Sequence, residues 1–353
     1  MDTHPILFKE LSLESDGSKA GLVELNRAKA LNALNHQMIK SLSKQLSDWE
    51  HDDNIKFIIL TSTSNRFCAG GDIKEAYFKL TEGNTSDVQQ FITDEYKLDY
   101  QIYSYCKPII SLGSGIIMGG GLGLFAASQV RLLTSDTILA MPETKIGLYP
   151  DVGATYFLTN KNKDFGLFAG LTSATLNSAD ALQLNICDLV VDSYTIDSLI
   201  EILINSNIDL TDKNEIISLL NSKFKTSELP KSNFTDNEIA IKNIIAKNNF
   251  EDIINSIYNH ESENEWFNSC KQNLTYSSPT SQYITYETLT KSGLSRAEVM
   301  KLETKISISQ IISDEFKEGV RALLIDKDKT PAWKPNSINE IDKTKIKQLT
   351  TIS

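Results

Sequence analysis

Two glycine-rich segments and the pair of carboxylates that follows them carry the residue types that could do chemistry in this chain. The first segment reads RFCAGGDIK (residues 66–74), and the second reads GIIMGGGLG (residues 115–123). The carboxylates, Glu143 and Asp151, lie in MPETKIGLYPDVG (residues 141–153). Two separate glycine turns can direct two backbone N–H groups at one oxygen, and acidic side chains can act beside it. These are the groups needed to stabilise a thioester enolate or a tetrahedral oxyanion.

Each of these signals also has an ordinary structural explanation. A glycine cluster between an apolar strand and an apolar helix is most often a tight connection. An acidic residue beside Pro142 or Pro150 is usually a helix cap or a turn former. Cys68, within the first glycine segment, is more typical of a small buried packing residue than of a nucleophile. The order and spacing of the signals together favour the chemical interpretation.

Other catalytic and binding devices are disfavoured. The glycines of the second segment do not have the Gly-x-Gly-x-x-Gly spacing of a dinucleotide-binding loop, and the phosphate-loop pattern ending in Gly-Lys-Ser/Thr is absent. The four cysteines show no Cys-x-x-Cys spacing, which disfavours a disulfide scaffold or a zinc site and favours a reducing compartment. All the histidines lie outside the motifs, which disfavours a Ser-His-Asp or Cys-His device and a metal site: His4, His36, His51 and His260.

Length and composition narrow the class of protein. At 353 residues the chain predicts one large domain plus an appendage. The 35 basic and 46 acidic side chains leave a net charge of −11, which disfavours general binding to nucleic acid or to an anionic membrane. The first residues resemble neither a secretion signal nor an Arg-rich transit stretch, and no apolar run reaches membrane-spanning length. We therefore expect a soluble, cytoplasmic protein.

The elements that must position these motifs alternate along the first half of the chain. Short apolar runs predict strands at residues 6–11, 21–25, 55–60, 108–112, 130–133 and 138–140. Apolar residues at helical spacing predict a helix at residues 35–50, and a second helix opens on the glycines from Gly119. Strands and helices that alternate in this way indicate an α/β core, which we place at residues 1–190.

Residues 191–353 are expected to form a mainly helical C-terminal region. Asp212 has the form of a helix N-cap, and helices are expected over residues 237–259 and 296–324. Residues 326–335 are expected to be extended and ordered, and the polar ending beyond them is expected to fray.

The motifs resemble those of the crotonase (enoyl-CoA hydratase/isomerase) superfamily and, within it, the 3-hydroxyisobutyryl-CoA hydrolases. The resemblance runs from about Leu22 to Pro335 and is thin only between about residues 192 and 277. It implies a spiral core of repeated ββα units with a helical C-terminal portion. The segments that carry the likeness are LNRAKALNAL (25–34), the two glycine segments, residues 141–153, SPTS (278–281) and EGVRALLIDKD (318–328); simple hydratases lack a counterpart of the last two.

The resemblance also implies roles for individual residues. The N–H groups of Gly71 and Gly120 would form an oxyanion hole around the thioester carbonyl. Glu143 would be the principal catalytic carboxylate. Asp151 would be the second, bonding the substrate hydroxyl or handling a proton. Glu95 corresponds to a further carboxylate that contacts substrate, although an isolated Glu on a polar helix is ordinarily a solvated surface charge.

Further substrate contacts are implied on the two sides of the first glycine segment. Asp72 and Ile73 would bind substrate directly. Lys29 and the backbone around Leu31 would lie along the adenosine end of coenzyme A, although Lys29 has the alternative explanation of an ordinary exposed lysine.

One position separates the subfamilies. Enoyl-CoA hydratases carry a second catalytic Glu three residues after the middle glycine of the second turn, where this chain has Gly123. Hydration is therefore disfavoured, because it would lack one of its two acids. We expect an acyl-CoA thioester hydrolase of valine degradation that acts on 3-hydroxyisobutyryl-CoA, with Glu143 as either nucleophile or general base. The alternatives are another hydratase/isomerase reaction and a non-catalytic assembly protein.

The same hypothesis predicts which cofactors and partners the chain binds. Thiolate is already a good leaving group, so no metal or redox cofactor is expected, and coenzyme A enters only as part of the substrate. The expected partner is a small acyl-CoA molecule, with no nucleic acid and no membrane. A homo-oligomer remains open.

Overall fold

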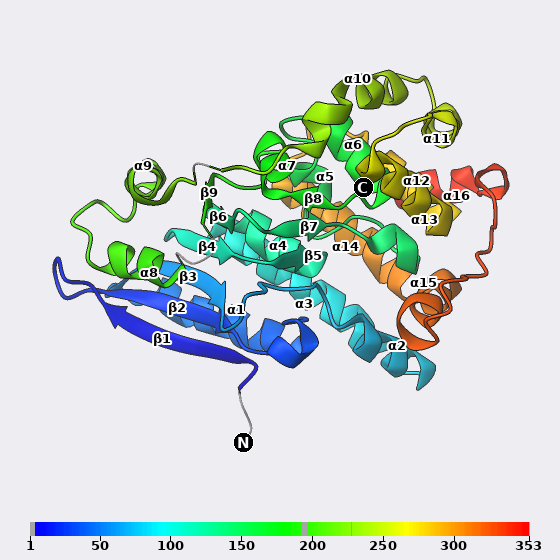
Figure 1. Ribbon diagram of the computed structural model, residues 1–353. Coiled ribbons are helices and arrows are strands. Elements are labelled where there is room, and N and C mark those ends of the chain that lie inside the picture. The colour runs from blue at the N-terminus through cyan, green and yellow to red at the C-terminus, as the bar shows by residue number, and fades with distance from the viewer. Residues whose placement is uncertain (1–3, 193–195, 227, 353) are drawn as a thin grey trace. The chain divides into compact units, whose positions relative to one another are not determined.

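The computed structural model describes residues 4–192, 196–226 and 228–352 (Figure 1). The chain forms two compact units, each assembled from segments that are far apart in sequence. The first unit comprises Met1–Gly71, Lys97–Leu139 and Asn177–Lys231, and the second comprises Asp72–Tyr96, Ala140–Leu176 and Ser232–Ser353. These units interleave along the chain, whereas the expected boundary at residues 190 and 191 divides the sequence once. That boundary stays a prediction.

A six-stranded sheet is the centre of the first unit, and its strand order is β1-β2-β3-β4-β6-β9. The first two strands are antiparallel, with Ile6 opposite Leu25, and every later neighbour is parallel. Figure 1 shows the blue pair at one edge of this sheet. The strands are β1 (Ile6–Ser12), β2 (Lys19–Leu25), β3 (Ile55–Ser62), β4 (Ile109–Gly113), β6 (Val130–Thr134) and β9 (Leu189–Val191).

The sheet is apolar on both faces because its parallel strands are covered on both. All five residues of β4 and of β6 are buried. On one face, side chains such as Leu22 and Ile59 pack into a cluster with Leu199 and Leu220. These last two come from the helices α8 (Ile196–Ile204) and α9 (Lys213–Phe224).

The remaining elements of the first unit connect the strands. The helix α1 (His36–Glu50) buries Met38, Leu42, Leu46 and Trp49, as the helical spacing predicts, and Asn35 caps its N-terminus. The helix α4 (Gly120–Ala127) opens on glycine, as predicted. The others are η1 (Ala28–Ala30) and α7 (Ser178–Gln183), while β5 (Ile116–Met118), β7 (Ile138–Ala140) and β8 (Leu176–Asn177) form a small separate sheet.

Helices make up the second unit. The helix α3 (Thr85–Ser104) begins in this unit and ends in the first. Within the unit α13 packs against α6 and α16, and α15 packs against α2 and η2. The elements are α2 (Ile73–Thr81), η2 (Glu143–Ile146), α5 (Ala154–Phe157), α6 (Lys163–Thr172), α10 (Asn233–Ile245), α11 (Phe250–Asn259), α12 (Glu265–Tyr276), α13 (Pro279–Leu289), α14 (Arg296–Ile311), α15 (Asp314–Val320), the π-helical turn η4 (Arg321–Ile325), η5 (Ile338–Glu340) and α16 (Lys343–Leu349).

Three expectations for the helical region are wrong in detail. The helix expected at residues 237–259 is two helices, because the Asn249 side chain accepts a hydrogen bond from the Asp252 N–H and starts a new helix. The helix expected at residues 296–324 is broken in the same way by Ser313, which caps α15. Within the polar ending that was expected to fray, residues 343–349 form the helix α16, which buries Ile346.

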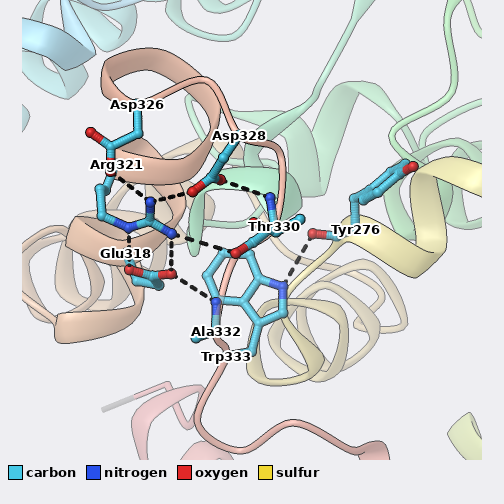
Figure 2. A network of polar contacts seen from close by, with 8 residues as sticks. All are labelled: Tyr276, Glu318, Arg321, Asp326, Asp328, Thr330, Ala332 and Trp333. Carbon is cyan, nitrogen blue, oxygen red and sulfur yellow. Dashed lines mark hydrogen bonds and ion pairs between the residues drawn. The ribbon is translucent and has the colours of Figure 1, made fainter.

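The stretch after η4 has no regular structure and is held by side chains (Figure 2). The Arg321 guanidinium donates hydrogen bonds to Glu318, Asp326 and Asp328 at 2.6–2.8 Å. The same Glu318 carboxylate accepts from the Ala332 N–H at 2.7 Å. Residues 326–335 are therefore held in place without being helical, but the expected extended conformation is wrong, because Lys327 and Lys329 have left-handed backbones (φ 59° and 57°). No helix among the described residues is long and apolar enough to cross a membrane.

Candidate active site

The two glycine turns lie side by side in the first unit. The Cys68 N–H donates to the Ile116 carbonyl at 3.1 Å, and the Met118 N–H donates back to the Cys68 carbonyl at 3.0 Å. A Cβ built on Gly70 would lie 3.6 Å from the Gly120 nitrogen. This short parallel pairing brings the turn that ends at residue 71 next to the start of α4.

The N–H groups of Gly71 and Gly120 are available to bind an oxygen. Gly120 is the first residue of α4, so its N–H has no acceptor within the helix. Gly119 precedes it in a left-handed conformation (φ 49°), which favours glycine. Among the hydrogen bonds of the described residues, neither N–H donates to another backbone group. The start of a helix also carries positive partial charge, which favours a developing oxyanion.

The packing beneath these turns explains two neighbouring residues. A Cβ at Gly121 would lie 2.5 Å from the Cys68 carbonyl oxygen, so this position must be glycine for the turns to meet. The buried Cys68 thiol donates to the Asn32 carbonyl at 3.2 Å, which agrees with a packing role. The Asn32 side chain in turn donates to the carbonyls of Arg66 and Phe67 at 2.8 and 3.1 Å.

The two residues expected at the adenosine end of the substrate lie beside the first glycine turn. The Ala69 N–H donates to the Leu31 carbonyl at 3.0 Å. Leu31 is 39% exposed and has a left-handed backbone (φ 52°). Lys29 lies in η1 with an exposed side chain. An apolar side chain and a cation thus stand at the surface here, and their contact with substrate stays a prediction.

The three expected carboxylates lie in the second unit, and all are buried. The exposed fractions are 7% for Glu143, 6% for Asp151 and 4% for Glu95. The surface-charge explanation of Glu95 is therefore wrong. Within the described part of the chain, Glu95 Oε1 and Glu143 Oε2 are buried oxygens with no hydrogen-bond partner. Unsatisfied buried carboxyl oxygens are costly, and they are typical of sites that bind a polar ligand.

Asp151 is held by hydroxyl groups. The Tyr96 hydroxyl donates to Asp151 Oδ2, and the Ser307 hydroxyl donates to the same oxygen at 3.0 Å. The backbone just after Asp151 is left-handed at two successive residues, with φ of 51° at Val152 and 91° at Gly153. Because a β-branched residue adopts this conformation only rarely, the surrounding contacts must hold the segment in place.

The segment that bears Glu143 is supported by the C-terminal helices of the same unit. The Thr144 hydroxyl is hydrogen-bonded to those of Ser173 and Ser277 at 2.7 and 2.8 Å. A Cβ at Gly147 would lie 2.5 Å from the backbone of Glu315 in α15. Gly147 has a left-handed backbone (φ 74°) at the end of η2. The backbone at Gly147 therefore packs directly against the backbone of α15.

Burial shifts the pKa values of these acids upward. Loss of water, reinforced by the charge of Asp151, raises the pKa of Glu95 to about 8 and raises that of Glu143 well above its usual range. Burial also raises the pKa of Asp151, but the hydrogen bonds from Tyr96 and Ser307 limit the rise to about 6. Asp151 is therefore the acid of this group that ionises most readily.

We expect the buried Glu95 to make the folded state less stable as pH rises. The unfolded chain loses this proton near pH 4.5, and the folded chain keeps it until about pH 8. The contribution is fully present below the lower value and is lost as pH rises to the upper one. Urea unfolding at about pH 5.5 and about pH 8 should show a smaller loss of stability in Glu95→Gln than in the parent. The exposed Glu261→Gln is the control, and equal losses in all three proteins would contradict the prediction.

Asp72 and Ile73 begin the helix α2. The Asp72 side chain is the N-cap of this helix and accepts a hydrogen bond from the Glu75 N–H at 3.2 Å. This local role explains the Asp without a substrate. The expected contacts of both residues with substrate stay predictions. Among the described residues, no group of three or more His, Cys, Asp and Glu is arranged to hold a metal ion.

Comparison with known proteins identifies the family. The model of the enoyl-CoA hydratase/isomerase family matches residues 20–350. The chain belongs to this family. The resemblance expected from the glycine and carboxylate motifs is thereby confirmed.

Several curated relatives of this enoyl-CoA hydratase/isomerase family member are named 3-hydroxyisobutyryl-CoA hydrolases. The 3-hydroxyisobutyryl-CoA hydrolase of Danio rerio is 35% identical over 91% of this chain and 84% of its own length. The human enzyme of the same name is 34% identical over 97% of this chain and 88% of its own. An Arabidopsis thaliana 3-hydroxyisobutyryl-CoA hydrolase is 31% identical over 95% of this chain and 90% of its own.

Solved structures confirm the crotonase fold. A carnitinyl-CoA dehydratase from Mycobacterium thermoresistibile is 28% identical with a TM-score of 0.85, covering 99% of this chain and 97% of its own. An enoyl-CoA hydratase from Rhodobacter sphaeroides 2.4.1 is 27% identical with a TM-score of 0.86 and the same coverage. The mixed α/β fold with a helical C-terminal portion is therefore as expected.

The expected cytoplasmic location is wrong. The relatives from Danio rerio, Gallus gallus, Xenopus laevis and Homo sapiens are named as mitochondrial enzymes, and these names contradict the expectation. Net charge and cysteine spacing, on which the expectation partly rested, do not identify an organelle.

The sequence motifs of this family member did not reveal every residue around the carboxylates. Tyr96 and Ser307 donate hydrogen bonds to Asp151. The Tyr149 hydroxyl is hydrogen-bonded to Ser307 and to the Glu303 carbonyl, and the Glu303 side chain accepts from the Gly153 N–H. Tyr96 directly follows Glu95, and Tyr149 lies within the motif of residues 141–153. Their positions next to predicted site residues could have identified them. Glu303 and Ser307 are four residues apart and directly follow the apolar Leu302 and Ile306, a spacing that places the pair on one face of a helix but does not show what the pair contacts.

Proposed function

We propose that this chain hydrolyses 3-hydroxyisobutyryl-CoA to 3-hydroxyisobutyrate and coenzyme A, as a step of valine degradation. Curated relatives that match nearly the whole chain are 3-hydroxyisobutyryl-CoA hydrolases, and they confirm the expected class of acyl-CoA thioester hydrolase. The observation that carries the choice within the family is the acid pair. Glu143 and Asp151 are present and buried, whereas position 123 is a glycine.

The proposed reaction uses the two sets of groups on one thioester. The N–H groups of Gly71 and Gly120 stabilise negative charge on the carbonyl oxygen, which makes the carbonyl carbon electrophilic. Ionised Glu143 then either attacks that carbon and expels the thiolate, giving a mixed anhydride that water opens, or takes a proton from an attacking water. Both routes end in the free acid and coenzyme A. Because the thiolate leaves readily, we propose that no metal or redox cofactor takes part.

Hydration of an enoyl-CoA is the competing function within the family, and two solved neighbours are a hydratase and a dehydratase. Adding water across a double bond needs one group to remove a proton from water and another to supply one to carbon. Gly123 lies in the buried helix α4 and has no side chain to offer. We therefore propose that crotonyl-CoA is hardly hydrated.

Asp151 should select substrates that carry the β-hydroxyl group. A buried carboxylate left without its partner penalises an acyl group that lacks the hydroxyl, and sites of this kind reject such analogues by about 10⁴-fold or more. We expect 3-hydroxyisobutyryl-CoA to be hydrolysed at least about 10²-fold faster than isobutyryl-CoA. The ratio should shrink in Asp151→Asn. The measurement is kcat/KM for both thioesters, together with crotonyl-CoA hydration, in one buffer.

The exposed Asp314→Asn is the matched control, since it makes the same chemical change on the surface of α15. Its ratio should equal that of the parent. Equal hydrolysis of the two thioesters by the parent would remove the role of Asp151. Brisk hydration of crotonyl-CoA would assign the chain to the hydratases instead.

A further inference from the structure

Two fully buried polar residues on α14 face the segment that carries Asp151. Glu303 and Ser307 are four residues apart, so they share one face of the helix. Neither residue belongs to any of the motifs that predicted the site. Buried polar side chains must find partners or they destabilise the fold, so their contacts are informative.

Glu303 holds the backbone immediately after Asp151. Its two carboxyl oxygens accept hydrogen bonds from the N–H groups of Gly153 at 2.6 Å and Thr155 at 2.9 Å. These N–H groups belong to the start of the short helix α5, where they have no acceptor within the helix. The same bonds fix the left-handed turn at Val152 and Gly153. A carboxylate that binds both N–H groups therefore determines where Asp151 points.

Ser307 bonds the carboxylate of Asp151 directly. Its hydroxyl lies 3.0 Å from Asp151 Oδ2, 2.7 Å from the Tyr96 hydroxyl and 3.1 Å from the Tyr149 hydroxyl. The Tyr149 hydroxyl also donates to the main-chain carbonyl of Glu303 at 3.1 Å. One turn of α14 thus contacts both the carboxylate and the loop that bears it.

We propose that Glu303 and Ser307 are positioning residues for the hydrolase reaction, fixing the Asp151 loop and one oxygen of its carboxylate toward the substrate hydroxyl. The proposal rests on the proposed function, because it assumes that Asp151 acts on a hydroxylated acyl-CoA. It goes further because it assigns part of the substrate selectivity to α14, a helix for which no contact with substrate is predicted.

Several other ionisable groups also surround Asp151. Glu95 and Tyr96 come from α3, Glu143 from η2, Tyr149 from the same loop as Asp151, and Glu303 from α14. Burial makes ionisation of Asp151 harder, and the hydrogen bonds from Tyr96 and Ser307 make it easier. Loss of the Ser307 hydroxyl must therefore shift the ionisation of Asp151 to higher pH.

The test compares Ser307→Ala, Ser307→Thr and Ser309→Ala. Ser309 is an exposed serine on the same helix and provides the same chemical change away from the site. In Ser307→Ala, kcat for 3-hydroxyisobutyryl-CoA should fall about 10-fold with KM nearly unchanged, since a misplaced catalytic group costs rate. The acid limb of the kcat profile should move upward by about one pH unit, the shift that corresponds to one hydrogen bond to a charged group.

The threonine variant keeps the hydroxyl and should recover most of the rate and the parent pH profile. A merely structural role would instead lower thermal stability in the alanine variant without moving the pH limb. Glu303→Gln supplies an independent variant of the same size, in which an amide can accept from only one of the two N–H groups. It should reduce the preference for the hydroxylated thioester over isobutyryl-CoA at least about threefold.

Three results would overturn the proposal: a parent pH profile in Ser307→Ala, no recovery in Ser307→Thr, or unchanged selectivity in a folded Glu303→Gln. Failure of the proposed function looks different. In that case the parent itself would not hydrolyse 3-hydroxyisobutyryl-CoA or would not prefer it over isobutyryl-CoA. An active and selective parent with unaffected variants defeats only the positioning role.

Discussion

Glu143→Gln should lower the rate of thioester hydrolysis by at least about 10²-fold, the low end for removal of a general base. The amide keeps the size of the side chain but can neither attack the carbonyl carbon nor accept a proton from water. Glu143 is buried with one oxygen unsatisfied, and the histidines of the chain lie outside the motifs, so we expect no histidine to replace it. The measurement is single-turnover hydrolysis of 3-hydroxyisobutyryl-CoA, which isolates the chemical step.

The control for this variant is the exposed Glu261→Gln, which should keep the parent rate. Binding of the substrate, measured by calorimetry with the inactive variant, should stay close to that of the parent. Replacing this buried acid by an amide of the same size should also leave the fold intact, because burial raises the pKa of Glu143 well above its usual range and so disfavours its charged form. Turnover near the parent rate in a variant that binds substrate normally would show that Glu143 is not the catalytic group.

Gly120→Val should abolish hydrolysis without unfolding the protein. A side chain at the first position of α4 would crowd the thioester carbonyl or tilt the N–H away from it, and loss of one oxyanion donor costs about 10²-fold or more. Gly120→Ala should show the same effect in a milder form. The measurements are kcat and thermal midpoint for each variant.

Gly121→Ala separates the donor role from packing. Its Cβ would meet the Cys68 backbone rather than substrate, so this variant should lose thermal stability as well as rate. A folded and fully active Gly120→Val would contradict the oxyanion assignment. A crystal structure with bound acyl-CoA gives the direct check: the thioester oxygen should lie within hydrogen-bond range of the N–H groups of Gly71 and Gly120.

Local sequence pattern predicts much of this fold because its elements follow simple periodicities. The strands β3 and β4 are mostly apolar because parallel strands are buried on both faces. The helix α1 has apolar residues at helical spacing and an Asn cap. The C-terminal helices were misjudged in length because Asn249 and Ser313 compete with helix continuation, and that competition is decided by tertiary packing rather than by composition.

Some residues of the candidate site could likewise be predicted from the sequence, and others could not. Glycine turns and acids in a fixed order are visible in sequence, and so Gly71, Gly120, Glu143 and Asp151 could be named. Burial of Glu95 was missed, although its position four and three residues after the buried Phe91 and Ile92 places it on the apolar face of α3. Glu303 and Ser307 act through contacts with residues about half a chain away in sequence, and no local pattern reports such a contact.

Because residues of α15 pack against the Glu143 loop, the ribosome makes this loop long before the residues that support it. Thr144 and Gly147 leave the ribosome well before Ser277 and Glu315, the residues that complete their packing. Synthesis proceeds from the N-terminus at about 5–20 residues per second, so the catalytic segment waits several seconds without its partners. A nascent chain therefore carries every predicted catalytic residue before it can hold them in place, and catalytic competence arrives only with the last helices.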